Sequence, residues 1–232
     1  LGDSLYLAQM ASKINNDKIV MAGVHFMAET AKIVNPSKKV LLPDLKAGCS
    51  LADSCPPKDF KIFKNKHPEA IVVTYINCSA EIKTLSDIVC TSSNAKRVIE
   101  SIPNDKEIIF APDKNLGKYL IKETGRNMIL WNGSCIVHEA FSFEKILKLS
   151  NNNPDAKFIA HPESDSTVLD FASFVGSTTG LLNFVQRDLS KKYIVATEVG
   201  ILHEMQKKCP DKIFIPAPVE DDTCACSECA YM

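Results

Sequence analysis

The sequence lacks long hydrophobic runs, an excess of charge of one sign, and aromatic residues in number. Its 232 residues carry 27 Lys and Arg against 28 Asp and Glu, for a formal net charge of -1. This balance gives no electrostatic reason to expect nucleic acid or an anionic membrane as a partner. The apolar runs are strand-sized, and no signal-like segment opens the chain, so we expect a cytoplasmic location and no membrane span.

Cysteine, by contrast, is abundant, with nine residues in the chain. In a cytoplasmic protein, thiols in such number serve a metal or a redox purpose more often than a disulfide framework. Composition therefore predicts a metal.

A weak internal repeat organises the chain. Each copy contains a hydroxyl-rich turn, then a strand and an amphipathic helix, then a second strand that leads to a cysteine. Ser92 follows Ser4 by 88 residues and precedes Ser177 by 85, and Cys135 follows Cys49 by 86 and precedes Cys229 by 94. A nearly constant period of alternating strands and helices predicts repeated α/β units with short, largely parallel sheets.

We therefore expect three αβα units related by a pseudo-threefold axis around a central site, at residues 1–49, 50–135 and 136–232. The second and third units have an additional strand before the hydroxyl turn, at Ala70 to Asn77 and Lys157 to Glu163. The first has no room for it, so the repeat predicts a strand with a polar tip upstream of Leu1.

The carboxyl ends of parallel strands collect ligands and reacting groups. If the three units point these ends inward, their terminal cysteines can share one metal centre. Thiolate ligands suit zinc or an iron-sulfur cluster, and a four-iron cluster held by three cysteines keeps one iron open to substrate. For the cysteine ligand of the third unit, spacing alone leaves three candidates, Cys224, Cys226 and Cys229. A zinc clip or a redox-sensitive dithiol would also explain this group of cysteines.

Ordered motifs along the whole chain resemble the quinolinate synthase family, the iron-sulfur enzymes of NAD biosynthesis. The stretches that carry the resemblance are Gly2-Asp3-Ser4-Leu5-Tyr6, Gly23-Val24-His25-Phe26-Met27, Ala47-Gly48-Cys49-Ser50, Tyr75-Ile76-Asn77, Cys90-Thr91-Ser92-Ser93-Asn94-Ala95, Trp131-Asn132-Gly133-Ser134-Cys135, His161-Pro162-Glu163, Gly176-Ser177-Thr178 and Thr197-Glu198-Val199-Gly200. Each motif is weak by itself, but the ordered set is specific.

The resemblance implies three αβα units around a 4Fe-4S cluster that acts as a Lewis acid. The implied reaction condenses iminoaspartate with dihydroxyacetone phosphate to quinolinate, with loss of phosphate and water. The implied cluster ligands are Cys49, Cys135 and Cys229, which leaves Cys224 and Cys226 as spare thiols or a redox pair. The partners are then small molecules, with a transient contact to an enzyme that supplies iminoaspartate.

Family members also have an upstream strand whose histidine and tyrosine contribute to catalysis, and neither precedes Leu1. If the protein lacked that strand, we would expect weak or no turnover.

The resemblance also assigns roles to polar residues at strand ends. Glu163 is expected to act as general acid or base, with His161 assisting proton transfer or binding an anionic group. Tyr75 is the third expected catalytic residue and donates to a substrate carboxylate, which Asn77 orients. His138 ranks below His161. The hydroxyl residues at expected helix N-termini, where carboxylate or phosphate can bind, are Ser4, Ser92, Ser177 and Thr178.

Two rival functions remain open at this stage. A zinc-dependent hydrolase or lyase could use the same three thiolates with a bound water. A non-catalytic metal or redox sensor could use only the cysteines from Cys224 to Cys229.

Overall fold

The computed structural model describes residues 4–220 and residue 229. These residues fall into two compact units, the first ending at Ser134 and the second beginning at Cys135. Every strand pair in this part of the chain is parallel. The predicted fold class, α/β with short parallel sheets, is confirmed. Among the described residues, no helix combines the length and the apolar character that crossing a bilayer would require.

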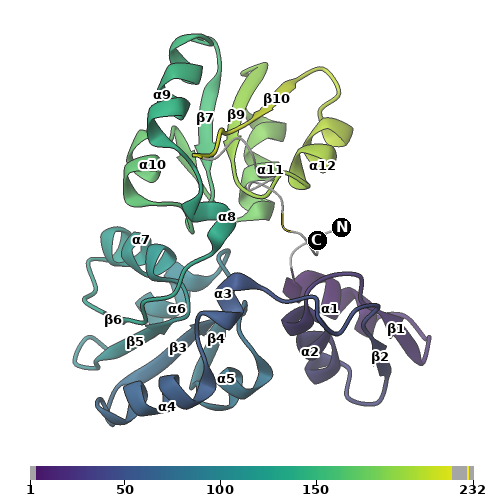
Figure 1. Ribbon diagram of the computed structural model, residues 1–232, viewed down its shortest axis with the longest axis vertical. Coiled ribbons are helices and arrows are strands. Elements are labelled where there is room, and N and C mark those ends of the chain that lie inside the picture. The colour runs from purple at the N-terminus through teal and green to yellow at the C-terminus, as the bar shows by residue number, and fades with distance from the viewer. Residues whose placement is uncertain (1–3, 221–228, 230–232) are drawn as a thin grey trace. The chain divides into compact units, whose positions relative to one another are not determined.

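The first compact unit begins with a small two-stranded sheet and two helices (Figure 1). These elements are α1 (Ser4–Ser12), β1 (Lys18–Val20), α2 (His25–Val34) and β2 (Lys39–Leu41). The buried residues of α2 recur at helical spacing and form one apolar face. The Asn35 side chain, just after α2, donates a hydrogen bond of 3.0 Å to the carbonyl oxygen of Ala8 in α1, which ties the two helices together.

The rest of this unit is a four-stranded parallel sheet in the order β4-β3-β5-β6, with helices on both faces (Figure 1). Its strands are β3 (Ile71–Tyr75), β4 (Ile88–Cys90), β5 (Ile108–Ala111) and β6 (Ile129–Leu130). Its helices are α3 (Ser50–Asp53), α4 (Pro57–Asn65), α5 (Ala80–Thr84), α6 (Ala95–Ser101) and α7 (Lys114–Thr124). All four residues of β5 are buried, as expected for a strand covered on both faces.

The second compact unit is also a three-layer structure around a parallel sheet, in the order β10-β9-β7-β8 (Figure 1). Its strands are β7 (Lys157–Ala160), β8 (Phe174–Val175), β9 (Lys192–Ala196) and β10 (Ile213–Pro216). Its helices are α8 (Ile136–Glu139), α9 (Phe143–Asn151), α10 (Ser166–Phe171), α11 (Thr178–Arg187) and α12 (Ile201–Lys208).

Along the central strands of this sheet, successive side chains pack alternately into two separate hydrophobic cores. Phe158 of β7 packs with Ile146 of α9, whereas the next residue, Ile159, packs with Leu181 of α11. Successive side chains of a strand point to opposite faces, so α9 and α11 cover opposite faces of the sheet. Both faces are therefore closed to water, and polar chemistry is confined to the strand ends.

The two four-stranded sheets share one topology, which supports the internal repeat. In each, the first strand in sequence lies between the second and the third, and the fourth lies at the edge beside the third. The expected additional strands appear as β3 and β7. The exact division at residues 1–49, 50–135 and 136–232 stays a prediction.

Gly133 occupies a crowded position directly before the junction of the compact units. It forms a parallel bridge with Asp113, and its carbonyl oxygen accepts a hydrogen bond of 2.8 Å from the Lys114 amide. A Cβ atom there would lie 2.6 Å from the carbonyl oxygen of Pro112 and would also collide with the Ser54 hydroxyl. A backbone atom cannot swing away, so glycine is required here for close approach.

We expect Gly133→Ala to destabilise the first compact unit by about 1–3 kcal/mol, the usual cost of overpacking a close-packed site. The measurement is thermal unfolding of the metal-free chain by calorimetry. Gly23→Ala is the matched control, because its Cβ would meet only the flexible Met27 side chain, at 3.1 Å from the sulfur. Equal melting temperatures for the two variants would contradict the prediction.

Candidate metal and acid-base site

A cluster of polar residues lies at the carboxyl ends of the central strands of the second compact unit. His161 and Glu163 follow β7, and Thr197 follows β9. The His161 amide donates a hydrogen bond of 2.9 Å to the Ala196 carbonyl oxygen, which extends the pairing of β7 and β9 to the strand tips. His138 joins them from α8. Parallel pairing thus brings together residues distant in sequence.

The two oxygens of the Glu163 carboxylate face different histidines. Oε2 lies 3.4 Å from Nδ1 of His138, and Oε1 lies 3.6 Å from Nδ1 of His161. The other nitrogen of His138, Nε2, lies 3.2 Å from the Thr197 hydroxyl. The two imidazole rings have centroids 4.9 Å apart and are tilted by 31°. The carboxylate is therefore held between two closely spaced rings.

Burial strengthens the electrostatic interactions among Glu163, His161 and His138. Glu163, His161 and His138 are only 2%, 3% and 7% exposed. Burial opposes a charge on His138, but the Glu163 carboxylate and the Cys135 sulfur outweigh it and raise the pKa of His138 well above its usual value. Burial lowers the pKa of His161 to about 4, with His138 adding to the effect and Glu163 opposing it. Near neutral pH, one imidazole is charged and its neighbour is neutral.

This asymmetry suits acid-base chemistry. The charged His138 stabilises the Glu163 carboxylate, while neutral His161 accepts a weak hydrogen bond of 3.4 Å from the Glu163 amide at Nδ1. That contact leaves the proton of His161 on Nε2. Groups held in different protonation states side by side are typical of sites that move protons.

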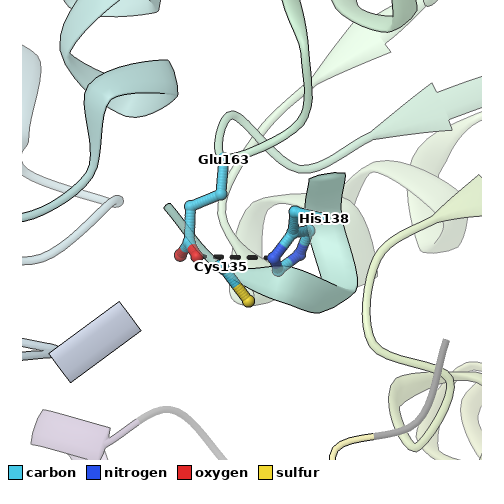
Figure 2. Close-up of side chains that lie close together, drawn as sticks. All are labelled: Cys135, His138 and Glu163. Atoms are coloured by element: carbon cyan, nitrogen blue, oxygen red, sulfur yellow. Dashed lines mark ion pairs between the residues drawn. The ribbon is translucent and has the colours of Figure 1, made fainter. Parts of the chain in front are cut away.

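Cys135 completes a potential metal site with His138 and Glu163 (Figure 2). One ligand atom from each of the three residues lies within 4.8 Å of those of the other two. Cys135 is the residue directly before α8, so a single short helix positions both the sulfur and the imidazole. Thiolate, imidazole and carboxylate together form a donor set that can hold a transition metal.

The described cysteines fall into two groups by exposure. Cys49, Cys135 and Cys229 are half-buried, whereas Cys55, Cys78, Cys90 and Cys209 are buried. The three half-buried cysteines are those predicted to ligate the cluster, while Cys224 and Cys226 lie outside the described residues. Cys49 and Cys135 also share a local setting, since each directly precedes a four-residue helix and has extended backbone angles. The sulfurs predicted as ligands are thus the accessible ones.

We expect alkylation of the metal-free native protein to follow this division. Burial raises the pKa of Cys55 and of Cys90 to about 12, and burial, partly offset by Lys83, raises that of Cys78. Because the thiolate is the reactive form, iodoacetamide should label Cys49, Cys135 and Cys229 well before these three. Peptide mass spectrometry checks the order, with the unfolded protein as the control that labels every cysteine. Early labelling of Cys90 would contradict the expectation.

The remaining predicted site residues lie at strand ends or helix starts of their own units. Tyr75 is buried at the end of β3, and half-buried Asn77 follows it. Ser92 follows β4, the neighbour of β3 in the sheet, so these residues share one edge. Ser177 follows β8, which pairs with β7 and so shares the edge that carries His161 and Glu163.

The expected helix N-termini are found for three of the four hydroxyl residues. Ser4 is the first residue of α1 and Thr178 is the first residue of α11. Ser177 caps α11, its hydroxyl accepting a hydrogen bond of 3.1 Å from the Gly180 amide. Ser92 instead lies in the turn ahead of α6, and Asn94 occupies the cap position. The turn has an extra residue before its helix, because Asn94 uses its side chain to accept from the Thr91 amide.

The structure brings two residues into this cluster to which the sequence assigns little weight. The sequence favours His161 over His138 and gives Thr197 no role beyond its motif. The signal for His138 is its spacing of three residues from Cys135, which places both on one face when the segment is helical. Thr197 offers no such signal, because its contact with His138 joins residues 59 positions apart.

Comparison with known proteins agrees with the site. The family model described as "Quinolinate synthetase A protein" matches residues 1–232. The chain is 60% identical to a quinolinate synthase of Synechococcus sp. and 61% identical to those of Trichormus variabilis and Chloroherpeton thalassium. Each match covers 100% of this chain and 71–72% of the relative. With a family match over its whole length and relatives this similar, the chain belongs to the quinolinate synthase family of enzymes.

Proposed function

We propose that the enzyme condenses iminoaspartate with dihydroxyacetone phosphate to quinolinate, and that Cys49, Cys135 and Cys229 hold a 4Fe-4S cluster for this reaction. The reaction releases phosphate and water and involves no net oxidation. One observation carries the proposal for the cofactor: among the described cysteines, these three alone are half-buried. Each follows the last strand of its sheet, as a threefold arrangement of ligands requires.

The donor set fits such a cluster. Three thiolates leave one iron without a protein ligand, and an iron-sulfur cluster is a soft centre that favours sulfur donors. The open iron would supply a Lewis acid for binding substrate and for easing the loss of a hydroxyl group as water.

Glu163 is the proposed general acid or base. Its carboxylate is almost fully buried between a charged and a neutral imidazole. One of the carboxylate oxygens lies within 4.8 Å of the Cys135 sulfur. His161, whose Nδ1 lies 3.6 Å from Oε1 and accepts from the Glu163 amide, carries its proton on Nε2, from which it can assist proton transfer or bind an anionic group of the substrate. His138 keeps the carboxylate in place and Thr197 orients His138.

Several groups are available for the anionic parts of the substrates. The N-terminus of α11, at Ser177 and Thr178, offers backbone N–H groups and the positive end of a ten-residue helix, which favour carboxylate or phosphate. In the first compact unit, Tyr75, Asn77 and Ser92 supply hydroxyl and amide groups at one sheet edge, and Ser4 opens α1. We assign these residues to substrate binding.

Quinolinate formation from iminoaspartate and dihydroxyacetone phosphate, by anaerobically reconstituted protein, tests the proposal. We expect a brown protein with broad visible absorbance, four irons and four sulfides per chain, and product detected by chromatography. A cluster-loaded protein that forms no quinolinate would rule out the assigned reaction for this chain. A colourless reconstituted protein that retains stoichiometric zinc would favour the zinc-dependent alternative.

A further inference from the structure

The second compact unit contains a set of metal-binding groups that the proposed cluster does not use. The cluster requires Cys135 together with two sulfurs from other parts of the chain. His138 and Glu163, however, place an imidazole nitrogen and a carboxylate oxygen within 4.8 Å of the Cys135 sulfur and of each other. All three residues belong to one compact unit.

We propose that, when the cluster is absent, Cys135, His138 and Glu163 bind a single divalent cation of the zinc class, in a mononuclear site separate in composition from the iron-sulfur centre. This site goes beyond the proposed reaction and does not depend on it. It gives the cluster-free protein an alternative metal-bound state that occupies a cluster ligand.

The distance between the nitrogen and oxygen ligand atoms fits a tetrahedral ion, and the sulfur lies within 4.8 Å of both. With bonds of about 2.3 Å to sulfur and about 2.0–2.2 Å to nitrogen or oxygen, two ligand atoms of a tetrahedral zinc site lie roughly 3.3–3.7 Å apart. Nδ1 of His138 and Oε2 of Glu163 are already 3.4 Å apart. The same separation is longer than a usual hydrogen bond of about 2.7–3.2 Å. The separation of these two atoms therefore falls within the range expected for two ligands of one metal ion.

The charges also balance within a buried setting. The cation would displace the Nδ1 proton of His138 and the thiol proton of Cys135, and both protons would leave to solvent. A divalent cation bound by one thiolate, one carboxylate and a neutral imidazole forms a neutral unit, so burial of the group carries little electrostatic penalty. Glu163 and His138 are 2% and 7% exposed, whereas Cys135 is half-buried and gives the ion a way in from solvent. Water or another small ligand would take the fourth position.

The surrounding contacts orient the imidazole for this role. The Nε2 atom of His138 lies 3.2 Å from the Thr197 hydroxyl oxygen, so Nε2–H can donate to it while Nδ1 faces the metal position. Metal-binding histidines typically fix their orientation through such a hydrogen bond on the opposite nitrogen. His161, although it is equally buried and adjacent, is directed differently, because its Nδ1 accepts from the Glu163 amide at 3.4 Å.

Cobalt binding to cluster-free protein, prepared anaerobically, tests the site. The background is a variant of the whole chain in which Cys224, Cys226 and Cys229 are replaced by serine, which removes the three thiols that are closest together in the sequence. We expect one Co²⁺ per chain, a thiolate-to-cobalt charge-transfer absorption, the strong visible bands of tetrahedral cobalt, and full displacement by Zn²⁺.

Variants then separate this site from other metal sites. In the same background, Cys135→Ser should remove the charge-transfer band, and His138→Gln and Glu163→Gln should each weaken binding by at least tenfold. Thr197→Val should weaken it roughly 10- to 100-fold, the usual effect of losing a partner of a metal-bound histidine. The controls Cys49→Ser and His161→Gln should bind cobalt as the background does, and circular dichroism confirms that each variant is folded.

Three results would overturn the proposal: no cobalt bound by the background variant, unchanged binding in folded His138→Gln or Thr197→Val, or loss of binding in Cys49→Ser. A further expected result is competition, since zinc loaded first should slow iron-sulfur reconstitution of the unaltered protein by occupying Cys135. These measurements need no catalytic turnover, so they remain decisive whether or not quinolinate is formed.

Discussion

Replacing Cys135 or Cys49 by alanine is expected to abolish both the iron-sulfur cluster and quinolinate formation. In the proposed cluster each residue supplies one of three protein ligands, and the loss of one would leave two thiolates, too few to retain a cluster that already has an open iron. Both sulfurs are half-buried, so removal of either should leave the hydrophobic cores intact. Iron and sulfide content after anaerobic reconstitution, together with visible absorbance, measures the effect.

A matched control is available among the buried cysteines. Cys55 packs in the core between α4 and the central sheet, so Cys55→Ala should retain a full cluster and lose only a little stability. Cys229→Ala should behave as Cys135→Ala does, whereas Cys224→Ala and Cys226→Ala should keep the cluster. If Cys49→Ala and Cys135→Ala both retained their metal, the sensor built on Cys224 to Cys229 would be the better hypothesis.

Glu163→Gln is expected to lower kcat by about 10²- to 10⁴-fold, the usual contribution of a general acid or base. Glutamine has nearly the same shape and can still accept a hydrogen bond, but it cannot take up or release a proton near neutral pH. Substrate binding should change much less than kcat, and one limb of the pH dependence of kcat should disappear. Steady-state kinetics with cluster-loaded protein gives all three quantities.

Glu144→Gln is the control for this change, because Glu144 is exposed in the first turn of α9. It should leave kcat and cluster content unaltered. A cluster-loaded Glu163→Gln enzyme with unaltered kcat would exclude Glu163 as the proton-transfer group and direct attention to His161, its neighbour at 3.6 Å.

Much of the fold could be predicted from the sequence because the chain repeats itself. The strands at β3 and β7 and the strands before each cysteine follow from constant spacing and apolar patterning, since each repeat must bury the same faces. Strand polarity then places Glu163 and His161 at one sheet edge. The arrangement of three units around an axis remains a prediction, as does the cytoplasmic location.

The charge states of the site residues could not be predicted from the sequence repeat. Whether His138 is charged depends on the Glu163 carboxylate 3.4 Å away, and its orientation depends on Thr197, a residue brought near only by β9. The position of Ser92 ahead of α6 also differs from the expected helix N-terminus. Asn94 holds the N-cap position without a side-chain cap hydrogen bond, and its side chain accepts from the Thr91 amide within the turn that contains Ser92.

The shared strand order bears on how the chain folds as it is made. Each four-stranded sheet pairs only strands that are neighbours in sequence or separated by one strand, so each sheet can form from one continuous stretch of the chain. Along the sequence, β2 precedes Cys49 and β6 precedes Cys135. During synthesis each of these two thiols therefore leaves the ribosome only after the strands described here for its sheet, which limits the time that a reactive sulfur spends on an unfolded nascent chain.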